Sequence, residues 1–130
     1  MAIRIVRLGT PRARDEGPRL GTVRRPPRGV KKQDHARLNF YDVWLPDLAP
    51  SAQLVSWALV EPWTAARWKR FARRYHTEMK KPEAQRLLML LATLSHETNF
   101  SVGCYCENES HCHRSLLRDL LVSYGATLRP

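Results

Sequence analysis

The sequence predicts an α/β fold: one small, three-layer-like domain with a short, largely parallel sheet flanked by about four helices. Three observations predict it. Apolar segments follow one another in the order strand, helices, strand, helix. The chain has 130 residues, the length of one domain, which we place at 1–130. With 43% hydrophobic residues and four tryptophans, it can form a core without disulfides.

The first elements are a strand and a long loop region. Ile3 and Ile5 alternate with basic residues, which predicts a strand with one face toward water. Residues 9–34 are rich in glycine, proline and arginine, which indicates basic, partly mobile loops with one short strand near Leu20–Arg24. Two consecutive prolines end that strand, because proline has no amide hydrogen to donate to a ladder.

Three helices follow, each with a recognisable start. Ser51 is suited to cap a helix that ends near Leu59, and Thr64 to cap one that ends near Lys80. Pro82 fits the first turn of the third helix. The wide apolar arc of that helix predicts deep burial. Its members are Leu87, Leu88, Leu90, Leu91, Ala92 and Leu94.

The last two elements form a strand-loop-helix junction. Residues 100–106 read as a central strand, in which alternation places Cys104 and Cys106 on the same face. A polar turn follows, and we expect the last helix to begin at about Ser110 or His111.

The formal net charge of +10 is concentrated in two blocks. Residues 1–34 carry a net charge of +7 and residues 64–81 a net charge of +6. Such blocks attract phosphate-bearing partners, but a solvated basic surface is the simpler interpretation of them.

Membrane insertion and secretion are not indicated. No apolar run approaches the roughly 20 residues that cross a bilayer. The first residues lack the pattern of a signal peptide. All three cysteines lie between Cys104 and Cys112, which is not a secreted disulfide framework. We therefore expect a cytoplasmic protein without membrane contact.

The segment from Cys104 to Arg114 is the candidate site. Its loop leaves the carboxyl end of an inner strand, where open α/β sheets bind ligands. The amides at a helix start favour an anion. Our leading hypothesis is a pocket for a nucleotide or nucleic-acid phosphate at the 106–114 turn. The expected ligand-binding residues are Arg114, His111, Ser110, Arg24 and Arg28.

A cysteine-dependent enzyme is the second hypothesis. Cys112 or Cys106 would be the nucleophile, with His113 or His111 as the base, because a cysteine near a helix start and histidines has a lowered pKa. Against this, the four-residue spacing of Cys112 from Leu116 also fits a buried structural cysteine.

Arg114 is open to a second interpretation as well. It either binds a ligand or forms an ion pair with Glu107, Glu109 or Asp119.

The spacing of the cysteines disfavours zinc. The segment holds more than the four ligands that zinc takes, yet structural sites usually pair two Cys-x-x-Cys knuckles. Here Cys104 and Cys106 are two residues apart, and Cys112 follows after five more residues. We therefore assign no metal ligand and expect no cofactor. A disulfide between Cys106 and Cys112 is geometrically possible.

The third hypothesis is a nucleic-acid-binding module without catalysis. It would use the basic face of the second helix. The residues of that face are Arg67, Arg70, Arg73 and Arg74.

Several stretches carry a resemblance to a known family. They are Pro27–Lys32, Val43–Ser51 with Leu54 and Trp57, Trp68–Met79, and Cys104-Tyr-Cys-Glu with Cys112-His-Arg-Ser115. On these residues the chain resembles the domain-of-unknown-function family 488, and more narrowly its small YeaO-like bacterial members, over residues 1 to about 124.

The resemblance implies a single α/β domain with a pocket between the Cys-His-Arg turn and the Arg-Gly-Val region. It implies no established reaction, so it leaves open whether the protein is an enzyme. Further positions that match the family are Arg24, Arg28, Lys31, Trp44 and Asp47. This chain departs from the family at Val23, where similar proteins have an acidic residue, and at Pro26, where they have tryptophan.

Overall fold

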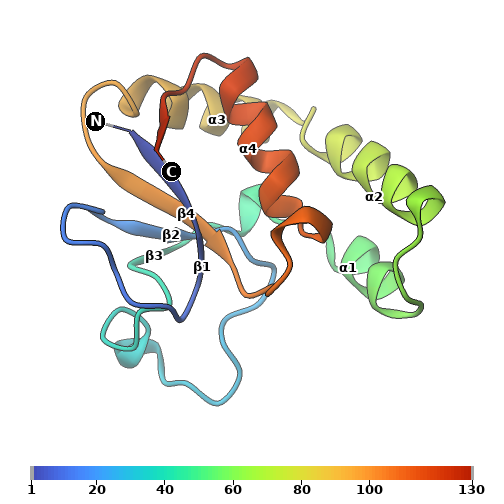
Figure 1. Cartoon of the computed structure of the whole chain (residues 1–130), viewed down its shortest axis with the longest axis horizontal. Coiled ribbons are helices and arrows are strands. Elements are labelled where there is room, and N and C mark those ends of the chain that lie inside the picture. Colours follow the sequence, from blue (N-terminus) through green and yellow to red (C-terminus); the bar gives the residue numbers. More distant parts are fainter. Residues whose placement is uncertain (1, 130) are drawn as a thin grey trace.

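The computed structural model describes residues 2–129 and confirms the α/β class (Figure 1). Its strands are β1 (Ile3–Arg7), β2 (Arg19–Gly21), β3 (Val43–Trp44), β4 (Phe100–Cys104) and β5 (Leu128–Arg129). Its helices are α1 (Ala52–Leu59), α2 (Ala65–Glu78), α3 (Pro82–Leu94) and α4 (His113–Ser123). The strands form one parallel sheet in the order β3-β2-β4-β1-β5.

Strand β4 is the centre of the sheet and leads to the candidate site. It pairs with β1, where Ile3 lies opposite Phe100, and with β2, where Leu20 lies opposite Val102. All five residues of β4 are buried, as expected of a parallel strand covered on both faces. Its carboxyl end, Cys104, therefore lies inside the protein.

The loop region before β2 is anchored by an ion pair that the sequence did not predict. Arg19 is fully buried and makes two hydrogen bonds to the Glu16 carboxylate, at 2.7 and 2.9 Å. Ser101 on β4 donates a third, at 2.7 Å. The strand predicted near Leu20–Arg24 begins at Arg19 instead. Mobility of residues 9–34 stays a prediction.

The predicted starts of α1, α2 and α3 are confirmed. The Ser51 hydroxyl accepts a hydrogen bond from the Leu54 amide, and the Thr64 hydroxyl accepts one from the Arg67 amide. Pro82 is the first residue of α3. These boundaries follow from local sequence alone, which explains why they were predictable.

Two helix predictions were wrong in part. The apolar arc of α3 is not deeply buried throughout, because Leu90 is 53% exposed and Leu94 is 38% exposed. Helix α4 begins at His113, later than predicted, since residues 109–111 form a separate 3-10 turn. Consequently Ser110 and His111 belong to the loop before the helix.

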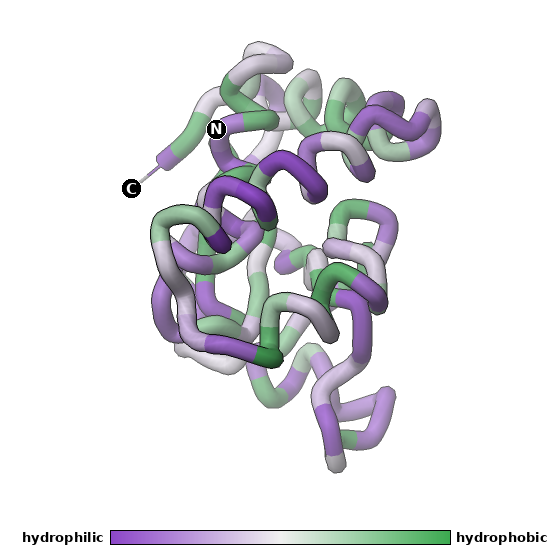
Figure 2. The backbone as a smooth tube through the Cα atoms, turned by 90° about the vertical axis from the view of Figure 1, so that its right-hand side faces the viewer, coloured by the Kyte–Doolittle hydropathy of each residue, from purple (hydrophilic) through white to green (hydrophobic). Residues whose placement is uncertain are grey.

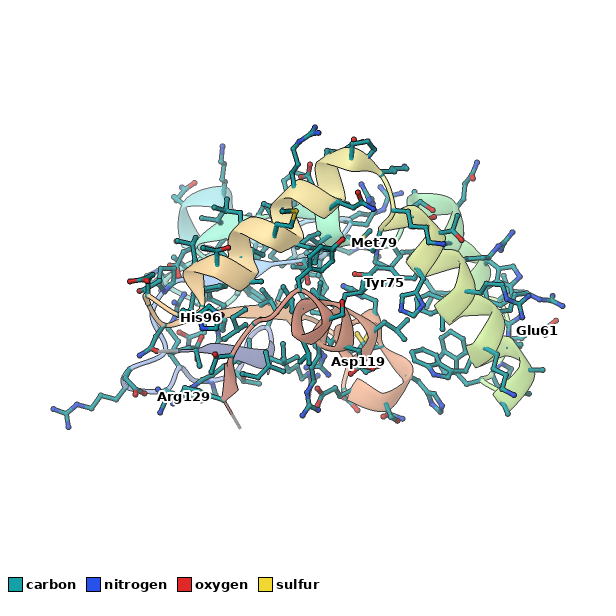
Figure 3. All side chains as sticks on the ribbon, turned by 90° about the horizontal axis from the view of Figure 1, so that it is seen from above. Glu61, Tyr75, Met79, His96, Asp119 and Arg129 are labelled. Atoms are coloured by element: carbon teal, nitrogen blue, oxygen red, sulfur yellow. The ribbon has the colours of Figure 1, made fainter. Side chains whose placement is uncertain are left out.

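Side chains from all four helices meet in the main core. Helices α3 and α4 lie close to the sheet, and α1 and α2 extend away beyond the end of β4 (Figure 1). Figure 3 shows Tyr75 and Met79 on the side of α2 that faces α3 and α4. Tyr75 is fully buried, and its hydroxyl donates to the Leu48 carbonyl at 2.8 Å. This packing holds α2 beside the start of α4.

Hydrophilic and hydrophobic stretches alternate along the backbone (Figure 2). In the part of the chain that the structure describes, no helix is both long and apolar enough to span a bilayer.

Candidate functional site: a three-cysteine cluster

The three cysteine sulfurs meet at the carboxyl end of β4. Cys104 ends the strand, Cys106 follows two residues later, and Cys112 lies immediately before α4. All three sulfurs lie within 4.8 Å of one another, and those of Cys104 and Cys106 are 3.7 Å apart. None of the three cysteines is disulfide-bonded, so the Cys106–Cys112 disulfide is not formed in this structure. Alternation along the extended chain brings the first two together, and the 3-10 turn returns the third.

His113 is a buried, neutral imidazole. It is only 5% exposed, and its Nε2 atom lies 2.6 Å from the Thr22 carbonyl oxygen. Because a carbonyl only accepts hydrogen bonds, Nε2 carries the proton, and the free lone pair is on Nδ1, 3.8 Å from the Cys112 sulfur. Burial lowers the pKa of His113 to about 4, more than its hydrogen bond to Thr22 raises it. The imidazole therefore faces Cys112 and is fixed in one tautomer.

Arg114 is a buried residue of α4 that holds the turn after β4 in place. It is 4% exposed, and its Nη2 atom donates to the Cys106 carbonyl at 2.7 Å. The predicted ion pair with an acidic neighbour is not formed: within residues 2–129, Arg114 has no carboxylate partner, and Glu107 contacts Arg7 instead. A buried positive charge without a counterion therefore lies beside the cysteine cluster.

The three thiols differ in acidity. Hydrogen bonds from Cys104 and Cys112, aided by the charge of Arg114, hold the pKa of Cys106 far below its usual range, against the effect of burial. The pKa of Cys104 rises to about 11, chiefly because it donates to Cys106, and that of Cys112 rises further for the same reason. These shifts favour a cluster with one thiolate, on Cys106, and two thiols. Cys106 is also the exposed member, whereas the other two are buried.

A cavity of about 720 Å³ opens over the cluster. All three cysteines contribute to its lining. Its walls come from Trp63 and Phe71 at the α2 side and from the loop that includes Arg28. The cavity therefore combines an apolar wall with a basic rim, which is the usual character of a small-molecule site.

The two ligand-binding candidates that precede α4 take different places. His111 lines the cavity, with its ring centroid 5.8 Å from that of Trp63 and 5.4 Å from that of Trp68. Ser110 is exposed, and its hydroxyl bonds to the Asn108 side chain at 2.6 Å. Ser110 is not among the residues that line the cavity.

The two arginines from the proline-rich loop also differ. Arg28 is exposed at the cavity rim. The Arg24 guanidinium donates to the Pro50 carbonyl at 2.9 Å and to two further carbonyls before α1. Arg24 therefore fixes the loop against α1 and lines the cavity with its side chain, but much of its hydrogen-bonding capacity is already used.

The basic face of α2 is only partly free. The Arg67 guanidinium lies 4.2 Å from the Trp57 ring centroid and donates to the Trp57 carbonyl at 3.0 Å. It also pairs with Glu61 at 3.5 Å. Arg74 lies over the same ring at 5.5 Å, whereas Arg70 and Arg73 are among the exposed residues. Of the four proposed nucleic-acid contacts, Arg67 thus has an internal role.

Sequence reasoning missed two contributors to the site. Thr22 holds the His113 tautomer, and Trp63 forms a wall of the cavity. The sequence offers no signal for Thr22, because the contact spans 91 residues. Trp63 stands directly before the Thr64 cap, where an apolar residue commonly packs on the following helix.

The fold and site define an α/β protein with a thiol-lined cavity at the carboxyl edge of a parallel sheet. Residues 3–125 match a family model described as the active DUF488-N3 subclade. The chain therefore belongs to the DUF488 family, which confirms the resemblance found in the sequence. No curated protein and no solved structure gives a significant match to the chain.

Proposed function

We propose that the protein is an enzyme that uses the Cys106 thiolate as a nucleophile toward a small electrophilic substrate bound in the cavity. The observation that carries this proposal is the geometry of the cluster: three sulfurs lie within 4.8 Å of one another, and the exposed one, Cys106, lines the cavity and has a strongly lowered pKa. A thiolate is the reactive form of cysteine.

This arrangement favours the cysteine hypothesis over the phosphate-pocket hypothesis. The positive charge of Arg114 was expected to hold a bound anion, but it lies buried beside Cys106 and donates to the Cys106 carbonyl. The anion that this charge stabilises is thus the protein's own thiolate.

The histidines then have roles other than deprotonating the nucleophile. The Nδ1 atom of His113 contacts the sulfur of Cys112 and holds that side chain in place. His113 is not needed as a base for Cys106, because the proposed nucleophile is already a thiolate. His111 also lines the cavity, where it is placed to act as a general acid toward a leaving group. The basic rim at Arg28 favours a substrate with an anionic group, and the aromatic wall favours an apolar body.

The pH dependence of alkylation tests the proposal. Between pH 5 and 8, an ordinary thiol with a pKa of about 8.5 reacts roughly tenfold faster for each pH unit, because its thiolate fraction rises. We expect the alkylation of Cys106 by iodoacetamide, located by peptide mass analysis, to be nearly independent of pH over this range. Cys106→Ser should abolish this phase. A rate at Cys106 that rises tenfold per pH unit would contradict the proposal.

The substrate preference has its own test. Iodoacetate carries a carboxylate, whereas iodoacetamide is neutral, and both alkylate the same sulfur. We expect the basic rim to raise the ratio of the iodoacetate rate to the iodoacetamide rate, and Arg28→Gln to lower it severalfold. The matched control is Arg118→Gln, on an exposed residue of α4 that does not line the cavity. An equal ratio in the two variants would rule out the anionic preference.

A further inference from the structure

The cysteine cluster has the dimensions of a metal site. Zinc–sulfur bonds of about 2.3 Å at tetrahedral angles place two sulfur ligands about 3.8 Å apart. The sulfurs of Cys104 and Cys106 are 3.7 Å apart, and the whole cluster lies within 4.8 Å. The unusual spacing of the cysteines along the sequence does not keep them apart, because the loop returns at Cys112 and brings the third sulfur to the first two.

The local charge suits such an ion. A divalent cation bound by three thiolates has a net charge of −1. Arg114 supplies a compensating +1, buried and without a carboxylate partner in residues 2–129. Its bond to the Cys106 carbonyl also holds the turn that carries one ligand.

The ligand set leaves one position open. His113 is the nearest other candidate, since its Nδ1 atom lies 3.8 Å from the Cys112 sulfur, but it is not among the groups that converge within 4.8 Å. Because all three cysteines line the cavity, a fourth position would face it. Three protein ligands with one open position are typical of catalytic zinc sites rather than structural ones.

We infer that Cys104, Cys106 and Cys112 bind one thiophilic divalent cation of the zinc class, with a fourth coordination position open to the cavity for water or a small ligand. This goes beyond the proposed function, because the bound cation occupies the Cys106 sulfur. The metal-loaded and nucleophilic forms therefore exclude each other.

Binding must release protons. Two thiols and one thiolate combine with the cation to give a trithiolate complex and two protons. The apparent binding constant should therefore increase about 100-fold for each pH unit around neutrality, as expected when ligands are deprotonated on binding. If Cys106 were an ordinary thiol, three protons would leave and the increase would be about 1,000-fold.

The experiment titrates the reduced full chain with Cd²⁺ and Zn²⁺ at several pH values. Cadmium–thiolate charge-transfer absorption reports binding directly, and competition gives the zinc affinity. Since the sequence contains three cysteines in all, the signal must come from this cluster. We expect saturation at one equivalent, and protection of all three cysteines from alkylation by Zn²⁺.

Variants separate coordination from folding. Cys104→Ser and Cys112→Ser should each weaken binding about 100-fold while circular dichroism remains that of the folded protein. His96→Ala, on an exposed histidine that does not line the cavity, should leave the affinity unchanged. Absence of saturable binding by the wild-type chain, or retained affinity in both serine variants, would overturn the inference.

The two proposals fail in different ways. If alkylation of Cys106 is independent of pH but no cation binds, only the metal inference is wrong. If one cation binds with the release of three protons, the metal site stands and the thiolate proposal is wrong.

Discussion

The buried imidazole of His113 makes the stability of the protein sensitive to mild acid. In the folded state its pKa is about 4, whereas the unperturbed value is 6.5. Between these two values the unfolded chain binds more protons than the folded one. The contribution of His113 to the unfolding free energy is therefore fully present above pH 6.5 and is lost as the pH falls toward 4.

The magnitude follows from the two pKa values. A difference of about 2.5 pH units corresponds to about 3 kcal/mol, at roughly 1.36 kcal/mol per unit. This is a large part of the roughly 5–15 kcal/mol that is typical of the unfolding free energy of small domains. Urea unfolding at pH 7, 6, 5 and 4 measures it.

His113→Gln is the matched variant. Its side-chain amide nitrogen reproduces the donor to the Thr22 carbonyl, but it does not titrate. We expect the difference in unfolding free energy between wild type and variant to shrink by about 3 kcal/mol from pH 7 to pH 4. The remainder of the chain is identical in the two proteins, so its contribution to the pH dependence cancels. A difference that stays constant over this range would refute the assignment of His113 as buried and neutral.

Three further predictions concern the frame around the site. Glu16→Gln leaves the buried guanidinium of Arg19 without its counter-charge, so at pH 7 it should cost about 3 kcal/mol in urea unfolding. Burial raises the Glu16 pKa, but hydrogen bonds lower it to about 2, so this difference should disappear as the pH falls from 4.5 toward 2. Gly103→Ala places a methyl group 2.8 Å from the Val6 carbonyl oxygen within the sheet, and should lower the unfolding free energy by about 2 kcal/mol. Tyr75→Phe removes a buried donor from a loop carbonyl, and should lower the melting temperature by an amount equivalent to about 1–2 kcal/mol. An unchanged unfolding midpoint in any one of these variants would contradict the contact on which it rests.

The features that the sequence predicted depend on contacts between residues close together in the chain, whereas those that it missed depend on contacts between distant segments. The caps at Ser51 and Thr64 depend on residues three positions away, so the helix starts were predictable. The shared face of Cys104 and Cys106 depends on strand alternation, which is equally local. The fold class followed from the order of such elements.

The candidate site was only partly predictable, because its chemistry depends on contacts between distant segments. The third sulfur joins the cluster only through the path of the loop before α4. The tautomer of His113 is set by Thr22, which is 91 residues away along the chain. Periodicity does not report such contacts, so the sequence located the segment and left the roles of its residues open.

The two outermost strands have a consequence for how this protein meets other chains. Both edge strands, β3 and β5, are only two residues long. Each edge of the sheet therefore offers few backbone amide and carbonyl groups for pairing with another strand. A neighbouring polypeptide would find little to extend there, which is one way that natural sheets avoid aggregation. Association by added strands is therefore disfavoured.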